Sequence, residues 1–225
     1  VVPSQIIVVR PNYKNLLLFY KFLAAHKTFN FIPNASTLPS VNLSISQKKL
    51  LKKKYILGKS RLIVYFGFIY PHKGVENILK IANPETDQVV IAADMEPQNK
   101  YHKYLKSIIT KKWNNRVSLI KYMPEKDLAA LLSVADAIIL PFRDGGGIWN
   151  TSIHAAVSSR SFLLTTSINI NGFNKDLNTY YGSTDNINEM RDALDKYSGT
   201  KNLNKTVTDS WAEISKKHIQ VYDRN

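Results

Sequence analysis

The sequence LIVYFGFIYPHKGVENILKI, residues 62–81, contains the pattern that decides the fold class. Leu62–Phe66 is an unbroken apolar and aromatic run, typical of a buried strand. After a turn that contains Gly67 and Gly74, apolar residues recur at 75, 78, 79 and 81, the spacing of an amphipathic helix. A buried strand followed by a helix is the unit from which parallel sheets are built.

The same alternation continues along the rest of the chain. Further strands are predicted at Val89–Ala92, Val117–Ile120, Ala137–Leu140, Phe162–Thr165 and Thr179–Gly182. Further helices are predicted at Lys100–Lys112, Pro124–Val134, Ser152–Val157, Asn188–Tyr197 and Val207–Val221. Short apolar strands separated by helices predict an α/β fold, a doubly wound, Rossmann-like parallel sheet over residues 58–200.

The first 57 residues fit this pattern less well. They contain one predicted strand, Ile6–Val9, one predicted helix, Tyr13–Leu23, and a connector rich in Pro, Asn and Ser at Phe31–Ser40. One β–α unit cannot bury its own apolar face. We therefore expect residues 1–57 to pack on the main domain or to be the end of another domain, with the last helix, in residues 201–225, covering the junction.

The composition provides enough apolar residues for a folded core. The protein has 225 residues, of which 44% are hydrophobic and 11% aromatic, and this excludes a largely disordered chain. It has no cysteine, which excludes a disulfide scaffold, a cysteine-ligated metal site and thiol catalysis. Its apolar runs are too short to cross a bilayer, and none resembles a signal peptide.

Charge is distributed unevenly along the chain, whose formal net charge is +14. Residues 1–75 contain twelve of the 31 Lys and Arg residues and no Asp or Glu, whereas the remaining 150 residues contain 19 basic and all 17 acidic residues. A surface of one sign attracts polyanions. The candidate partners are an anionic membrane, nucleic acid and phosphorylated small molecules. We interpret the lysine run at 48–54 as the solvated face of a helix.

The turn after Phe66 is the first candidate site. In an open parallel sheet, ligands bind beyond the carboxyl ends of the strands, near the point where the strand order reverses. Gly67 allows close approach of the backbone, and Lys73 lies at the start of a helix, where free N–H groups already favour an anion. The alternative is an ordinary glycine-flanked turn with an exposed lysine.

The turn after Leu140 is the second candidate site. Three successive glycines, Gly145–Gly147, followed by Asn150, Thr151 and Ser152 at a helix start, predict a concave nest of N–H groups beside hydroxyl donors. That geometry suits a diphosphate, and Asp144 at its rim would accept hydrogen bonds from sugar hydroxyls. The alternative is a flexible loop before an ordinary helix cap.

Signatures of other chemistry are missing from the sequence. His154, near the start of the same helix, has no second His or carboxylate at metal-ligand spacing, so a packed histidine is the alternative to a functional one. No paired carboxylates and no Ser-His-Asp arrangement are recognisable. We therefore predict no metal and no cofactor.

These two turns, in this order, resemble the donor-binding, C-terminal half of GT-B glycosyltransferases of the glycosyltransferase family 4 type. Phe66–Glu76 is similar to the family's turn for the donor phosphate, and Val134–Phe142 to its Ala-Asp, apolar run and Pro strand. Asp144–Ala156 and Phe162–Thr166 look like its glycine-rich loop, helix and next strand. Phe31–Asn34 resembles the linker between the two domains, and Trp211–Ile214 the closing helix.

The resemblance implies a role for each matching residue. Lys73 and Asp144 would be catalytic. The donor diphosphate would lie against Gly67, Lys73, Asn150, Thr151 and Ser152. The transferred sugar would lie near Asp144, Gly145, Gly146 and Gly147, and the nucleoside near Tyr122, Met123 and His154. The donor would be a sugar carried on UDP or GDP.

Several positions depart from the family pattern. Phe68 stands where the family has an arginine, and a second cation, Arg143 or Arg160, is a candidate to replace it. His154 stands at the second position of a Glu-x7-Glu motif, and Gly146 stands at the first. These departures leave open whether the chain is active and which sugar it takes.

The implied activity is retaining, metal-independent glycosyl transfer from a nucleoside-diphosphate sugar to a glycan or lipid-linked acceptor. Residues 1–30 resemble the end of the N-terminal, acceptor-binding half, so the chain would be an enzyme fragment or a donor-binding subunit. Basic residues 1–61 would hold it on an anionic membrane surface, as a cytoplasmic protein peripheral to the inner face. The alternatives are a non-catalytic nucleotide-sugar-binding module and, with no recognisable motif behind it, a nucleic-acid-binding protein.

Overall fold

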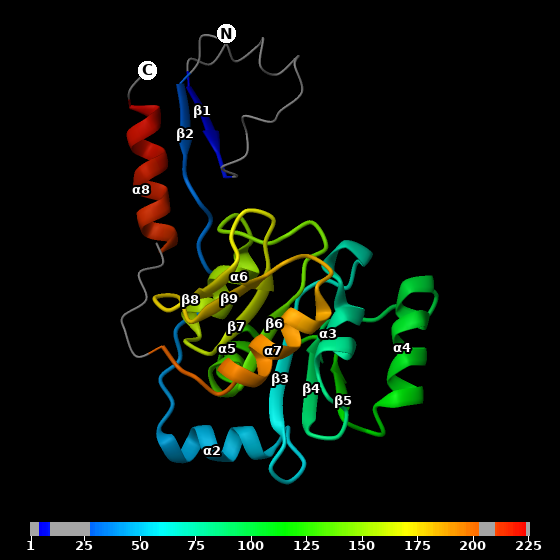
Figure 1. The fold of residues 1–225 in the computed structure, drawn as a ribbon. Coiled ribbons are helices and arrows are strands. Elements are labelled where there is room, and N and C mark those ends of the chain that lie inside the picture. Colours follow the sequence, from blue (N-terminus) through cyan, green and yellow to red (C-terminus); the bar gives the residue numbers. More distant parts are fainter. Residues whose placement is uncertain (1–4, 10–27, 203–209, 224–225) are drawn as a thin grey trace.

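The computed structural model describes residues 5–9, 28–202 and 210–223. Its main sheet has seven strands in the order β5-β4-β3-β6-β7-β9-β8 (Figure 1). Six strands run parallel, and β8 pairs antiparallel with β9 at one edge. The strands are β3 (Arg61–Phe66), β4 (Asp87–Ala92), β5 (Val117–Ile120), β6 (Ala137–Leu140), β7 (Leu163–Thr166), β8 (Gly172–Asn174) and β9 (Thr179–Gly182).

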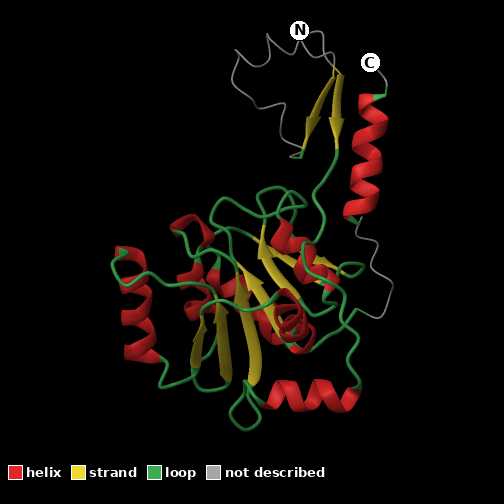
Figure 2. Ribbon diagram, turned by 180° about the vertical axis from the view of Figure 1, so that it is seen from behind, coloured by secondary structure: helices red, strands yellow, loops and turns green. Residues whose placement is uncertain are grey.

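Helices lie on both sides of this sheet (Figures 1 and 2). They are α2 (Ile45–Lys53), α3 (Val75–Ile81), α4 (Lys100–Lys112), α5 (Glu125–Val134), α6 (Thr151–Ser158) and α7 (Ile187–Tyr197). α3 packs against α4 and α7, whereas α5 packs against α2. Because both faces are covered, every residue of β4 and β6 is buried. The predicted doubly wound α/β fold is confirmed.

The strand order reverses between β3 and β6. From β3 the chain moves outward through β4 to β5, and it then returns to β6, which pairs with β3 on its other side. We call the side of the sheet beyond the carboxyl ends of the parallel strands the carboxyl edge, and the opposite side the amino edge. The turns after β3 and β6 are therefore neighbours at the carboxyl edge, where such folds bind ligands.

A smaller unit lies at one end of the molecule (Figure 1). β1 (Gln5–Val8) pairs parallel with β2 (Thr28–Phe31), and α8 (Trp211–Tyr222) lies beside them. Ile214 and Val221 of α8 are buried with Ile32 and Ala35, which follow β2. The expected helix at 13–23 lies outside the described residues.

The sequence patterns missed two short strands. β2 has four residues, of which none is buried, and β8 has three. Such segments are too short and too exposed to show an apolar period. The strand predicted at Thr179–Gly182 is confirmed as β9.

Candidate functional site

The turn after β3 is held in a fixed shape by its own residues. Ile69 is buried, and the Tyr65 hydroxyl donates to the carbonyl of Phe68 at 2.6 Å. Gly74, directly before α3, has a φ of 64°, and a Cβ there would clash with the carbonyl oxygen of Pro141. Only glycine fits this position without strain. Gly74 therefore lets the turn after β3 contact the strand end of β6.

The loop after β6 is braced by the neighbouring strand and by the linker that follows β2. Hydroxyls of β7 donate into it: Thr165 Oγ1 donates to Leu140 O at 2.8 Å, and Thr166 Oγ1 donates to Phe142 O at 2.5 Å. From the other side, Asn34 Nδ2 donates to Trp149 O at 2.8 Å. The loop is therefore anchored at both of its ends.

The two turns meet at the carboxyl edge. The backbone N–H of Arg143 donates to His72 O at 2.9 Å. The ammonium of Lys73 lies 4.6 Å from the ring centroid of Phe142, within cation–π range. Phe142 is itself buried against Gly146, where a Cβ would lie 2.6 Å from its ring and 2.8 Å from Ile153 of α6. The ring of Phe142 thus links the lysine to the glycine loop, and Gly146 in this loop also lies against Ile153 of α6.

The expected nest of free glycine amides is wrong. Gly145 N donates to Phe142 O at 3.2 Å, Gly146 N to Thr166 O at 2.7 Å, and Gly147 N to Asn150 Oδ1 at 3.0 Å. These amides shape the loop and are not available to an anion. The reason is tertiary, because β7 supplies the acceptor for the central glycine.

The start of α6 supplies donors instead. Asn150 is the N-cap residue, and Thr151 and Ser152 are the first two helical residues. No side chain caps this helix start, so the ordinary helix cap named as the alternative is not formed. Among the described residues, no hydrogen bond is made by the backbone N–H or the hydroxyl of Thr151 or Ser152. Free N–H groups in a first helical turn attract anions.

The other predicted site residues are spread along the same edge. Asp144 is exposed in the loop after β6. Tyr122 follows β5 and is 80% exposed, whereas Met123 packs partly against the core. His154 is buried, and its Nε2 lies 2.6 Å from Ile148 O. The histidine therefore holds the glycine loop, which is the packed alternative noted from sequence.

A buried carboxylate, missed in the sequence, organises the space beside Lys73. Glu76, in the first turn of α3, is 1% exposed and accepts hydrogen bonds from the Tyr101 hydroxyl and the Arg143 guanidinium. Burial would raise the pKa of Glu76, but the hydrogen bonds from Tyr101 and Arg143 and the charge of Arg143 lower it below its usual value. Tyr101 lies 25 residues and Arg143 67 residues from Glu76 in the sequence, so no local pattern predicts this cluster. The one signal in the sequence is that Glu76 is the first acidic residue of the chain.

The two arginines proposed to replace the family arginine lie at different places. Arg143 is at the carboxyl edge, and its side chain is 48% exposed although one of its nitrogens pairs with Glu76. Arg160 follows the carboxyl end of α6 with a φ of 65° and lines a cavity of about 750 Å³ with Lys48 and Lys201. Arg160 is therefore separated by the length of α6 from Thr151, and only Arg143 stays a candidate.

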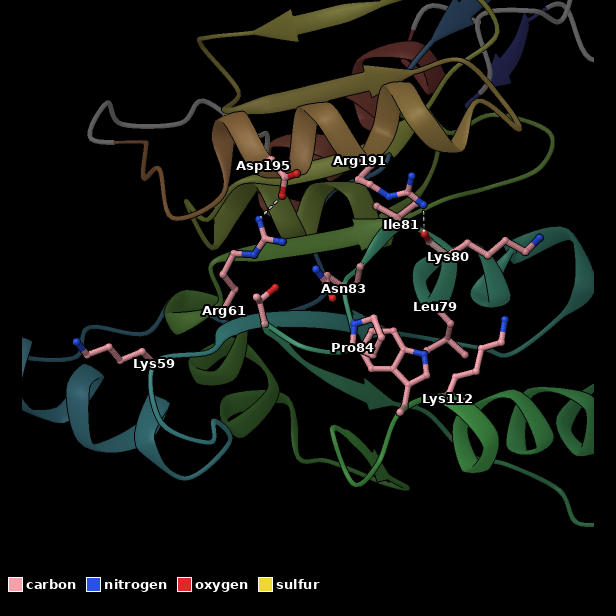
Figure 3. A pocket seen from close by; sticks show the side chains of 13 residues that line it. Lys59, Arg61, Leu79, Lys80, Ile81, Asn83, Pro84, Lys112, Arg191 and Asp195 are labelled. Atoms are coloured by element: carbon pink, nitrogen blue, oxygen red, sulfur yellow. Dashed lines mark hydrogen bonds and ion pairs between the residues drawn. The ribbon is translucent and has the colours of Figure 1, made fainter.

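A larger cavity, of about 850 Å³, lies at the amino edge, away from the predicted site residues (Figure 3). Its lining includes Arg61, at the start of β3, and Trp113, after α4. Within the described ranges, no three His, Asp or Glu side chains are grouped to hold a metal ion. No helix in this part of the chain is both long and apolar enough to cross a membrane.

Solved glycosyltransferase structures share this fold, although their sequences are distant. No protein-family model matches the chain, and no curated protein matches it. Sucrose-phosphate synthase from Thermosynechococcus elongatus superposes with a TM-score of 0.76 at 13% identity, over 98% of this chain and 58% of that one. Anabaena HepE, in complex with UDP and glucose, gives a TM-score of 0.72 at 14% identity, over 98% and 62%.

A third structure contains one domain only. It is the C-terminal domain of LpcC, a glycosyl transferase group 1 family protein from Francisella tularensis, with a TM-score of 0.55 at 17% identity, over 73% of this chain and 90% of that one. By contrast, the chain spans about three fifths of the synthase and of HepE, 58% and 62%. The chain therefore has the fold of the GT-B glycosyltransferases, consistent with the C-terminal half of that architecture.

Proposed function

We propose that this chain binds the nucleoside diphosphate of a sugar donor at the carboxyl edge and serves in glycosyl transfer. One observation carries the proposal. The turn with Lys73 and the loop that leads into α6 contact each other at the place where the strand order reverses, between β3 and β6. An ammonium and the free donors of a helix start are then presented on adjoining segments. This combination suits a diphosphate better than a neutral ligand.

In the proposed reaction, the bond between the anomeric carbon of the sugar and the diphosphate oxygen breaks, and negative charge develops on the leaving diphosphate. A hydroxyl of the acceptor forms the new glycosidic bond to that carbon, and its proton passes to the leaving diphosphate. Lys73 stabilises that charge together with the N–H groups and hydroxyls of Thr151 and Ser152. Asp144, exposed at the rim, accepts hydrogen bonds from sugar hydroxyls. On this proposal the departure is metal-independent, and the family resemblance implies a retaining outcome.

Arg143 is proposed as the second cation for the diphosphate. Its backbone is bonded to the residue before Lys73, and its guanidinium is oriented by the buried Glu76. An arginine fixed by a carboxylate presents its remaining N–H groups with little loss of rotamer entropy. This arrangement would compensate for Phe68, whose side chain is 73% exposed.

The structural neighbours support a nucleotide-sugar donor. HepE is described in complex with UDP-glucose, and the starch synthase IV catalytic domain of Arabidopsis thaliana as bound to ADP and acarbose. The chain covers 63% and 55% of these structures. We therefore propose that transfer to a glycan or lipid-linked acceptor uses this half together with an acceptor-binding half.

A non-catalytic nucleotide-sugar-binding module is the second candidate. Phe68 and Gly146 occupy positions where the family resemblance would place an arginine and a glutamate. Donor binding without transfer or hydrolysis, measured in a protein that also contains the acceptor-binding half, would favour this candidate.

Calorimetric titration tests the donor site directly. We expect the chain to bind UDP or GDP and the corresponding sugars, and Lys73→Ala to weaken binding about tenfold or more, because a charge-assisted bond to phosphate is lost. Lys80→Ala, in the last turn of α3, is the matched control and should bind like the unmodified chain. Absence of binding by the unmodified chain, or equal binding by Lys73→Ala, would show that the assignment is wrong.

A further inference from the structure

The amino edge carries a helix whose outer side is not used by the fold. α2 lies at the end of the molecule opposite to β1, β2 and α8 (Figures 1 and 2). Its start is closed by a capping box between Ser44 and Gln47. Its inner side is fixed by Leu51, which packs on the core, and by Lys52, whose ammonium lies 2.5 Å from Asp136 Oδ1.

The outer side of α2 combines lysines with an exposed leucine. At 100° per residue, Lys49 and Lys53 lie opposite Leu51, and Leu50 lies next to them. Leu50 is 64% exposed, and Leu57 in the following turn is 55% exposed. Within the described part of the chain, the ammonium groups of Lys49 and Lys53 form no ion pair or hydrogen bond. Lysines beside exposed aliphatic residues are typical of helices that lie in a membrane interface.

The cavity at the amino edge extends the same positive surface (Figure 3). Its basic lining residues are Lys59, Arg61, Lys80, Lys112 and Arg191, and of the described residues that line it only Asp195 is acidic. Arg61 is occupied, because it pairs with Asp195 and with the buried Asp87. Lys59 and Lys112 have no partner among the described residues, so they are available to an anion.

We propose that these lysines and Lys54, the exposed C-cap residue of α2, form a basic face, Lys49, Lys53, Lys54, Lys59 and Lys112, which docks on an anionic lipid bilayer. Leu50 and Leu57 enter the interfacial layer, and the cavity between Lys59 and Lys112 takes the phosphate of a lipid headgroup. Each lysine near an anionic surface and each leucine removed from water adds to the affinity. The interpretation of residues 48–54 as a merely solvated face does not account for Leu50.

The exposed leucines favour a bilayer over nucleic acid. A nucleic-acid backbone is bound by cations and polar groups, and aliphatic side chains beside them contribute nothing to phosphate contacts. The basic face also lies away from Lys73, since β3 has six residues and spans about 20 Å between the two edges. Docking and donor binding are therefore separable, and the docking proposal does not depend on the donor site.

Vesicle flotation tests the proposal with the full chain. The probes are vesicles of phosphatidylcholine alone and vesicles in which three parts in ten are phosphatidylglycerol. We expect binding to the anionic vesicles only, weakened about a hundredfold by the triple variant Lys49→Glu, Lys53→Glu, Lys54→Glu. Leu50→Ser with Leu57→Ser should weaken it about tenfold without any change in charge.

A second basic helix provides the matched control. The triple variant Lys100→Glu, Lys103→Glu, Lys106→Glu, on α4, changes the net charge equally and should keep most of the binding. Equal losses for the two triple variants would show attraction by net charge alone, and unchanged binding of the leucine variant would show that no side chain enters the interface. Either result, or tighter binding to a short DNA duplex than to the vesicles, would overturn the proposal. Circular dichroism of each variant separates these outcomes from misfolding.

Discussion

At the scale of single residues, the carboxyl edge depends on a few side chains that come from distant parts of the sequence. Glu76 is buried and holds Arg143, while Lys73 rests on the ring of Phe142. A buried carboxylate is tolerated only when it is paired and hydrogen-bonded. The pair therefore fixes the arginine at a place where, on our proposal, it meets a diphosphate.

Arg143→Gln should lower the affinity for UDP or GDP about tenfold, because one charge-assisted bond to the diphosphate is lost. Arg160→Gln is the control, since Arg160 lies beyond the far end of α6. Calorimetry on both variants checks this prediction. If the two variants bind equally, Arg143 is not the second cation.

Glu76→Gln should change how stability depends on pH. The pKa of Glu76 is lowered in the folded state, so its stabilising contribution is present above the pKa of the unfolded chain and is lost as the pH falls through the folded value. At neutral pH the variant should lose about 1–3 kcal/mol of unfolding free energy, because Arg143 loses its ionic partner. Urea unfolding at several pH values checks this, and a difference between the two proteins that persists unchanged into acid would contradict it.

At the scale of elements, the site is a product of two loops that fit each other. The turn after β3 can approach β6 only because Gly74 has no Cβ, and the loop after β6 keeps its shape because β7 and Asn34 bond to it. Once the two loops are in place, the start of α6 contributes its free backbone N–H groups to the candidate site.

Gly74→Ala should therefore lower the free energy of unfolding by more than the left-handed backbone conformation alone explains. Gly58 has a similar φ, 61°, but a Cβ at Gly58 would have no neighbouring atom within 4 Å, so Gly58→Ala isolates the backbone penalty of about 1 kcal/mol. Gly74→Ala adds the clash with Pro141 O, and we expect about 2–3 kcal/mol in total together with weaker nucleotide binding. Equal unfolding free energies for the two variants would show that the close approach is unimportant.

At the scale of the whole molecule, the chain forms one large sheet and one small unit, which consists of β1, β2 and α8. Among the residues that the structure describes, thirty-seven buried ones form the core of the large sheet, whereas Ile32, Ala35, Ile214 and Val221 form a separate cluster between the linker and α8. So small an apolar contact stabilises α8 weakly compared with the main core.

Ile214→Ser should release α8 while the large sheet stays intact. Hydrogen exchange is expected to accelerate in residues 211–222 and to remain slow in β3, β4 and β6. Ile219→Ser is the control, because Ile219 is 54% exposed. If exchange accelerates equally in the strands, α8 and the sheet unfold as one cooperative unit.

The alternation of apolar strands and amphipathic helices could be recognised from the sequence because a sheet covered on both faces requires unbroken apolar runs such as Ala137–Leu140. The two turns at the carboxyl edge could be located for the same reason, since they follow those runs. The use of the glycine amides could not be recognised. The acceptor of the central amide, that of Gly146, is the carbonyl of Thr166, which only the fold brings there, whereas Gly145 and Gly147 donate to the nearby Phe142 O and Asn150 Oδ1.

The sequence by itself thus determined the fold class, the order of the elements and the identity of the candidate turns, because these follow from local periodicity and turn chemistry. Only the tertiary structure decided that Glu76 meets Arg143 across 67 residues and that Asn34 reaches Trp149 across 115. It also separated Arg160 from the site and turned Leu50 outward. Such contacts depend on strand order and on which helix face is buried, and both are set by the packing of the whole chain rather than by neighbouring residues.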